Sequence, residues 1–265
     1  MIINSSHLWH NSYIWNLVFP WMNMRPRQIT SEPRRCLQAA LARIIVCASL
    51  LLLPASLILT KASVHAAEPA SISFTLDFPQ SSPEHYQIFV ESDGHAHYES
   101  TGKISADSDA RDDYETDFNL SDATRAHIFE LAAQAHYFSG KIDSGNKKLA
   151  FTGTKKLVYK DGQRNTSAEY NYSPQPAVQQ LTTLFQSVAA TLEFGRRLTY
   201  FHRYQKLALD DELKHMEEEA QRGDLAELNA VTPILQQIYD DNSVMNVVRA
   251  RARRIIEMRS ASAHN

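Results

Sequence analysis

The period of the hydrophobic pattern changes once along the chain, at the Ser-Pro-Gln-Pro segment of residues 173–176. Before it, residues 71–173 form short runs in which apolar and polar residues alternate, which is the pattern of half-buried strands. After it, apolar residues recur three or four positions apart among helix formers, as in amphipathic helices. The prolines mark the boundary, because a residue before proline disfavours the helical conformation. The chain is therefore predicted to be α+β, with a sheet domain over 67–175 and an all-helical C-terminal region over 176–265.

Seven segments of the sheet domain are predicted strands, because they are rich in aromatic and β-branched residues and are separated by turn formers. They are residues 71–78, 85–91, 95–101, 113–120, 148–153, 155–160 and 167–173. Short connections favour an antiparallel meander. One helix interrupts the series, with Ser121 as its expected N-cap. Its apolar face, expected to pack across the sheet, consists of Ile128, Phe129, Leu131, Ala132 and Ala135.

The first hairpin has two plausible registers, and the length of its turn decides between them. A two-residue loop would place His95 and His97 beside the core residues of the preceding strand. A three-residue loop at 92–94, with Gly94 in the left-handed conformation, places Tyr98 there instead. The three-residue loop is favoured, because it keeps charged side chains out of the core.

The helical region carries two apolar stripes that do not share a common phase. A bend, a break or a change of packing partner is therefore expected near residues 195–207. Gly223 is typical of a residue that ends a helix. Asp224, followed three residues later by Glu227, is typical of the start of the next one.

Two shorter helices are expected near the C-terminus. Thr232 and Pro233 predict the start of one, and Ser243 is the expected N-cap of the other. The last helix should turn a set of apolar residues inward, namely Val244, Val248, Ala252 and Ile255. Its arginines, at 249, 251, 253 and 254, should lie largely outside, where they can meet Asp210, Asp211, Glu217, Glu218 and Glu219.

An arginine-rich stretch followed by an apolar run precedes the sheet domain. Residues 44–59 are almost entirely apolar and lead to a cleavage site of the A-x-A type that ends at Ala66. Residues 34–66 are therefore predicted to be a signal peptide. The alternative is that residues 44–60 are retained as an anchor in the inner membrane. The run is slightly shorter than the ~20 apolar residues of a membrane span.

Both alternatives place the rest of the chain in the periplasm or outside the cell, because the arginines keep the N-terminus inside. Residues 1–33 form an unusually long N-terminal extension. A start of translation at Met22 or Met24 is the alternative interpretation of that length.

Removal of the leader changes the composition. Both cysteines, Cys36 and Cys47, lie within it, so the mature chain is cysteine-free and packing alone must hold it together. The leader removes six of the 27 basic and one of the 30 acidic residues, which leaves 21 and 29 and a net charge of −8. An acidic surface does not favour nucleic acid as a partner.

The pattern best suited to chemistry is His95-x-His97, with Glu91 and Glu99 nearby. Alternate residues of a strand project to the same side, so two imidazoles and a carboxylate can converge on zinc and leave a position for water. The alternative is that the histidines only belong to a polar strand face. Zinc is expected only if these histidines bind a metal, and the sequence predicts no other cofactor.

Three further patterns have alternative structural explanations. Glu212-x-x-His215 has the spacing of di-metal helical bundles, but the mature sequence has no second such element. Ser-x-x-Lys occurs at Ser100 and at Ser144, without the other elements of acylating enzymes. An aromatic group lies between arginines on the long helix and consists of Tyr200, Phe201 and Tyr204. It could form a contact surface for a partner or belong to the core.

The segments SPQPAVQQLTTLF, 173–185, and EFGRRLTYFHRYQKLALDDELKHMEE, 193–218, resemble parts of uncharacterised exported bacterial proteins. This resemblance implies a bacterial envelope protein and no particular reaction. With no catalytic signature in the mature sequence, the favoured function is a non-catalytic binding or structural module whose partner is an envelope protein or a glycan. The alternative is a metal-assisted hydrolase with His95 and His97 as zinc ligands.

Overall fold

The computed structural model describes residues 69–79, 81–104 and 111–262. The predicted extension, signal peptide and anchor lie outside the described residues. Among the helices within these ranges, none combines the length and the apolar character that a membrane span requires.

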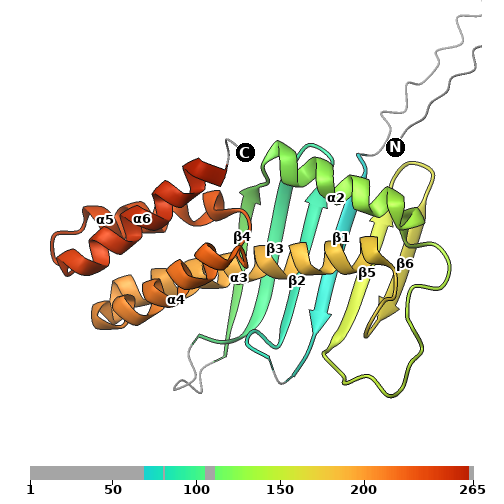
Figure 1. Ribbon diagram of the computed structural model, residues 1–265, viewed down its shortest axis with the longest axis horizontal. Coiled ribbons are helices and arrows are strands. Elements are labelled where there is room, and N and C mark those ends of the chain that lie inside the picture. The colour runs from blue at the N-terminus through green and yellow to red at the C-terminus, as the bar shows by residue number, and fades with distance from the viewer. Residues whose placement is uncertain (1–68, 80, 105–110, 263–265) are drawn as a thin grey trace, which may run out of the picture. The chain divides into compact units, whose positions relative to one another are not determined.

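The fold is α+β and its centre is a six-stranded antiparallel sheet in the order β4-β3-β2-β1-β5-β6 (Figure 1). The strands are β1 Ser71–Asp77, β2 His85–Glu91, β3 His95–Lys103, β4 Arg111–Asn119, β5 Thr154–Lys160 and β6 Asn165–Tyr170. The first four strands form the expected meander. The next strand differs from that prediction, because β5 pairs with β1 rather than with β4. The helix between β4 and β5 crosses the sheet and carries the chain to the other side of β1.

The first hairpin has the predicted three-residue loop. Strand β2 ends at Glu91 and β3 begins at His95, and Gly94 between them has a φ of 99°. Ile88 stands opposite Tyr98, and both are fully buried. The alternation that follows from this register puts the histidines of β3 on the side away from the core.

The predicted strand at 148–153 is wrong, because this segment is a loop. Phe151 is 58% exposed, and Gly153 has a φ of 95°, which breaks the extended conformation before β5. The side chain of Asn171 takes the place of a strand ladder. Its Oδ1 accepts from the backbone N–H of Thr152 at 2.9 Å, and its Nδ2 donates to the carbonyl of Ala150 at 2.9 Å.

Two helices cover the same face of the sheet, where the sequence predicted one. The first is α2, Asp122–Gln134, capped by Ser121 as predicted, and the second is the first half of α3, Pro176–Tyr204. Phe74 of β1 stacks on Phe185 of α3 with ring centroids 5.3 Å apart. The largest buried side chains between the helices and the sheet include Ile72, Ile88, Tyr98, Ile128, Leu131, Leu157 and Leu181.

A second core lies beyond the sheet, where the last part of α3 packs with the C-terminal helices. These helices are α4 Leu209–Arg222, α5 Thr232–Asp240 and α6 Asn246–Ser262, with short 3-10 turns η2 Lys206–Ala208 and η3 Leu228–Val231. The break predicted near residues 195–207 is confirmed, because α3 ends at Tyr204 and its C-cap Gln205 has a non-helical conformation. Gly195 permits close packing, since a Cβ there would stand 2.6 Å from Cγ1 of Val231. Helix α3 therefore contributes to both cores.

Two predicted helix starts are wrong, each because a polar side chain has another partner. Asp224 begins no helix, and Glu227 has a φ of 57° and turns its carboxylate to Ser121. There it accepts from the backbone N–H at 3.0 Å and from the hydroxyl at 2.7 Å. Ser243 does not cap α6, which begins at Asn246; its hydroxyl donates to Asp241 at 2.7 Å.

The predicted contacts between the last arginines and the acidic helix are confirmed in part. Arg254 donates to Glu217 at 2.6 and 3.0 Å, and Arg251 donates to the same carboxylate at 3.1 Å and also pairs with Asp210. Arg253 pairs instead with Glu257 on its own helix. These bonds fix α6 against α4.

The stability that Glu217 provides should depend on pH. The hydrogen bond from Arg254, more than any other cause, lowers the pKa of the Glu217 carboxyl below its ordinary 4.5. A carboxyl whose pKa is lowered by folding contributes its full stabilisation above the ordinary pKa. This stabilisation is lost as the pH falls from that value through the pKa of the folded state. Glu217→Gln should therefore lower the free energy of unfolding by about 1 kcal/mol at pH 7 and by less at pH 3. Urea unfolding at pH 7, 5 and 3 measures this, with Glu218→Gln on the exposed side as control; an effect that does not change with pH would contradict it.

Candidate functional site

One face of the sheet is covered by α2 and α3, and no helix of the described residues covers the other. We call this other side the open face. The strand register aligns its side chains in rows that cross the sheet: Ser73 stands beside Val158 and Phe89, Phe89 beside His97, and His97 beside Asp117. The open face thus presents a half-buried phenylalanine within polar neighbours. Its central side chains are Ser73, Thr75, Gln87, Phe89, His97, Glu99, Glu115, Asp117, Lys156 and Val158.

All four predicted site residues lie on the open face. They have odd numbers, and the register of β2 with β3 puts the odd-numbered side chains of both strands on this face. Nδ1 of His97 is 2.7 Å from Oδ1 of Asp117, a partner that the sequence did not indicate. The backbone N–H of His95 donates to Asp93 at 2.9 Å. Glu99 stands between Gln87 of β2 and Glu115 of β4.

Within the ranges that the structure describes, no three His, Cys, Asp or Glu side chains are arranged to hold a metal ion. Glu91, at the end of β2, faces Ser71 of β1. The strand pairing therefore brings His95, His97, Glu91 and Glu99 to one face without gathering three of them around one point. The zinc site stays a prediction.

A hollow of about 530 Å³ lies on the β2–β4 part of this face. The residues that line it are His85, Glu99, Ser100, Thr101, Asp113, Tyr114 and Glu115. Two of them are tied to neighbours: Nδ1 of His85 is 2.5 Å from Asp77, and the hydroxyl of Thr101 donates to Asp113 at 3.0 Å. The hollow is acidic, and Lys156 lies across the sheet from it on β5. The open face thus carries charge of both signs.

The other sequence patterns take structural roles. Glu212 accepts a hydrogen bond from Arg197 at 2.7 Å, while His215 is exposed. Ser100 is buried on the covered side, whereas Lys103, an odd number of residues along the same strand, projects to the other side. The aromatic group is divided, because Phe201 belongs to the second core and Tyr204 is 61% exposed.

A buried charged network that the sequence did not indicate lies under the sheet. Oε1 of Glu193, on α3, accepts from the hydroxyls of Tyr98 at 2.8 Å and Ser100 at 2.6 Å. Arg196 stands 3.4 Å from the other oxygen of Glu193 and donates to the carbonyl of Asp112 at 2.8 Å. Burial, and next the charge of Glu193, raise the pKa of the Tyr98 phenol. The network joins α3 to β3 and β4.

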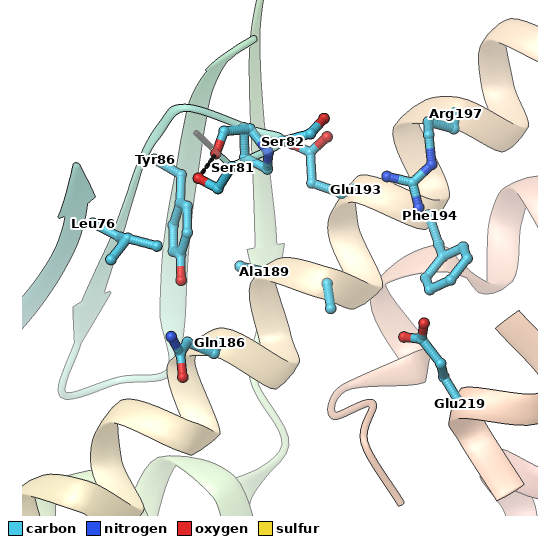
Figure 2. A pocket seen from close by; sticks show the side chains of 12 residues that line it. Leu76, Ser81, Ser82, Tyr86, Gln186, Ala189, Glu193, Phe194, Arg197 and Glu219 are labelled. Atoms are coloured by element: carbon cyan, nitrogen blue, oxygen red, sulfur yellow. Dashed lines mark hydrogen bonds between the residues drawn. The ribbon is translucent and has the colours of Figure 1, made fainter. Parts of the chain in front are cut away.

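Glu193 also lies at the wall of a cleft of about 310 Å³, which Figure 2 shows from close by. The loop between β1 and β2 forms one side with Ser81, and α3 forms the other with Gln186 and Ala189. Glu219 of α4 reaches it from beyond Phe194. Both oxygens of Glu193 already have partners, so this carboxylate positions the helix against the sheet.

No model of a known protein family matches this chain, and no curated protein matches it either. The resemblance of residues 173–185 and 193–218 to exported bacterial proteins therefore stays a prediction.

Proposed function

We propose that this protein is an exported, non-catalytic binding module of the bacterial cell envelope, and that the open face is its contact surface. One observation carries the proposal: a six-stranded sheet has its apolar side covered by two helices and its polar side without a covering helix in the described residues. A binding surface on a rigid sheet holds its side chains in fixed positions, which lowers the entropy lost on binding.

The chemistry of the face fits a polar partner. Phe89 offers an apolar patch at the centre, and hydroxyl, amide and imidazole groups surround it. Thr75 and Gln87 are already joined by a hydrogen bond of 3.1 Å, which keeps both side chains in place. Such a mixture suits an envelope glycan or the polar surface of an envelope protein, and the acidic total charge does not suit nucleic acid.

The proposal is tested by cross-linking and affinity capture from envelope fractions. The open-face variant carries Gln87→Ala, Phe89→Ala and His97→Ala, and the control carries Lys214→Ala and Glu218→Ala on the exposed side of α4. Wild type and control should recover the same partner, and the open-face variant should lose it. Protease treatment of the fraction distinguishes a protein from a glycan. Recovery that the open-face variant does not reduce, or no partner in repeated captures, contradicts the proposal.

Export is tested separately by cell fractionation and N-terminal sequencing. The mature chain should be found outside the cytoplasm and should begin at Ala67. A native product in the cytosol with its leader intact would contradict export, whatever the open face binds.

One observation favours the alternative of a metal-assisted hydrolase. A proton on Nδ1 of His97, donated to Asp117, leaves Nε2 available as an acceptor, and zinc-binding histidines use this carboxylate support. Zinc titration of metal-free protein tests it. Equal zinc binding by wild type and the His95→Ala, His97→Ala double variant would remove this alternative.

A further inference from the structure

A cavity of about 420 Å³ lies on the covered side of the sheet, away from the open face. It is bounded by the ends of β5 and β6 and by the first turns of α3. Thr152, Lys155 and Asn171 form its sheet side, and Gln179, Thr183 and Gln186 form its helix side. A volume of this size lies in the range of small-molecule sites, which span roughly 300–1,000 Å³.

The cavity holds a buried lysine whose hydrogen-bond acceptors are all uncharged. Lys155 is 5% exposed, and its ammonium donates to the carbonyl of Thr152 at 3.1 Å, the hydroxyl of Thr152 at 3.0 Å and the carbonyl of Asn171 at 3.1 Å. A weaker contact reaches the carbonyl of Gly153 at 3.4 Å. In the described part of the chain, no carboxylate forms an ion pair with it. Burial lowers the pKa of this amine.

A buried cation of this kind is unusual, because charged side chains inside proteins normally have a partner of opposite charge. Lys155 is the only charged residue among those that line the cavity. The surrounding side chains are neutral hydroxyls and amides, which can hydrogen-bond a ligand without repelling an anion. The cavity therefore has a positive charge at one wall and no negative charge at the others.

The start of α3 adds to this positive potential. The helix begins at Pro176 with no acidic residue in its first turn and no side-chain cap at Gln175. The N-terminal end of a helix carries about half a positive charge. Ser173 and Gln179, on either side of this end, both line the cavity.

We propose that this cavity binds a small organic monocarboxylate, whose negative charge compensates Lys155. One cation matches one carboxylate, and the amide of Gln186 and the hydroxyl of Thr183 line the cavity where they can hydrogen-bond the rest of the ligand. The amide nitrogen of Gln179 donates to Tyr172 and Ser173, which holds this wall in place. The ammonium has three N–H donors and four neutral acceptors, so the carboxylate takes one donor by displacing a neutral acceptor, and its charge compensates the buried cation.

Calorimetric titration of the full chain at pH 7 tests this with acetate, benzoate and glucuronate, and with benzamide as the uncharged counterpart of benzoate. At least one carboxylate should bind saturably, and benzamide should bind at least tenfold more weakly than benzoate if benzoate is bound. Lys155→Met should weaken carboxylate binding at least tenfold. Lys214→Met is the control, because that side chain is exposed on α4 and does not line the cavity, and carboxylate binding by this variant should equal that of wild type.

Lys155 also holds two loops together, so its replacement can unfold the protein, and a second variant is needed. Thr183 is exposed on α3 at the cavity wall, and Thr183→Trp should block the cavity without touching the ammonium. It should abolish carboxylate binding while the circular dichroism spectrum stays that of wild type. Carboxylate binding that Thr183→Trp leaves intact, equal binding of benzamide and benzoate, or no saturable binding of any carboxylate overturns the proposal.

Discussion

Replacement of Glu193 by alanine should lower the free energy of unfolding by about 3–5 kcal/mol, because it removes the buried charged partner of Arg196 and leaves only the half-exposed carboxylate of Asp112, at 3.7 Å. The side chains of Glu193 and Arg196 are 7% and 4% exposed, so their charges compensate each other with little contribution from water. The hydroxyls of Tyr98 and Ser100 lose their acceptor at the same time. Nε of Arg196 already has no hydrogen-bond partner within the described structure, so the loss of Glu193 adds to an existing unsatisfied donor.

Urea unfolding at pH 7 measures the effect. Glu257→Ala is the control, because its pair with Arg253 is about 60% exposed on both sides and should contribute at most about 1 kcal/mol. Glu193→Gln keeps the shape and one acceptor oxygen, so its effect should lie between the two. A loss for Glu193→Ala no greater than that for Glu257→Ala would show that the network does not join α3 to the sheet.

Six of the seven predicted strands and the first hairpin are confirmed, because their signals are local. The loop at 92–94 has a residue that tolerates positive φ, and the alternation of β2 and β3 permits only one register that buries Ile88 against Tyr98. The same alternation correctly placed His95 and His97 on one face. The pattern of one strand does not show which residue stands opposite on the next strand. Asp117 could therefore not be predicted as the partner of His97.

The buried charges could not be predicted because their partners are far away in sequence. Glu193 and Arg196 lie among helix formers, where charged residues normally face water, and the arginine is held by Ser100 and by the carbonyl of Asp112. Lys155 presents the same difficulty. Its position in an alternating strand marks it as inward-facing, but only the folded loop at Thr152 supplies the oxygens that make burial tolerable.

Replacement of Phe74 by alanine should lower the free energy of unfolding by about 3–5 kcal/mol, as large-to-small changes of buried aromatic residues do. Phe74 is fully buried at the centre of the sheet and stacks on Phe185 of α3 at 5.3 Å. Its removal therefore leaves a cavity between the sheet and the helix that also carries Glu193. Urea or thermal unfolding of the two proteins measures the difference.

Phe151→Ala is the matched control, and it also tests why the predicted strand at 148–153 does not form. Phe151 is 58% exposed and meets Phe78 edge-on at 6.0 Å, so its loss should reduce stability by less than about 1 kcal/mol. Both phenylalanines lie in segments that the sequence predicts to be strands, but Phe74 lies in β1 at the centre of the sheet, whereas Phe151 precedes Gly153, whose positive φ interrupts the extended conformation. If Phe151→Ala destabilises as strongly as Phe74→Ala, the segment is a buried strand in solution and the loop assignment is wrong.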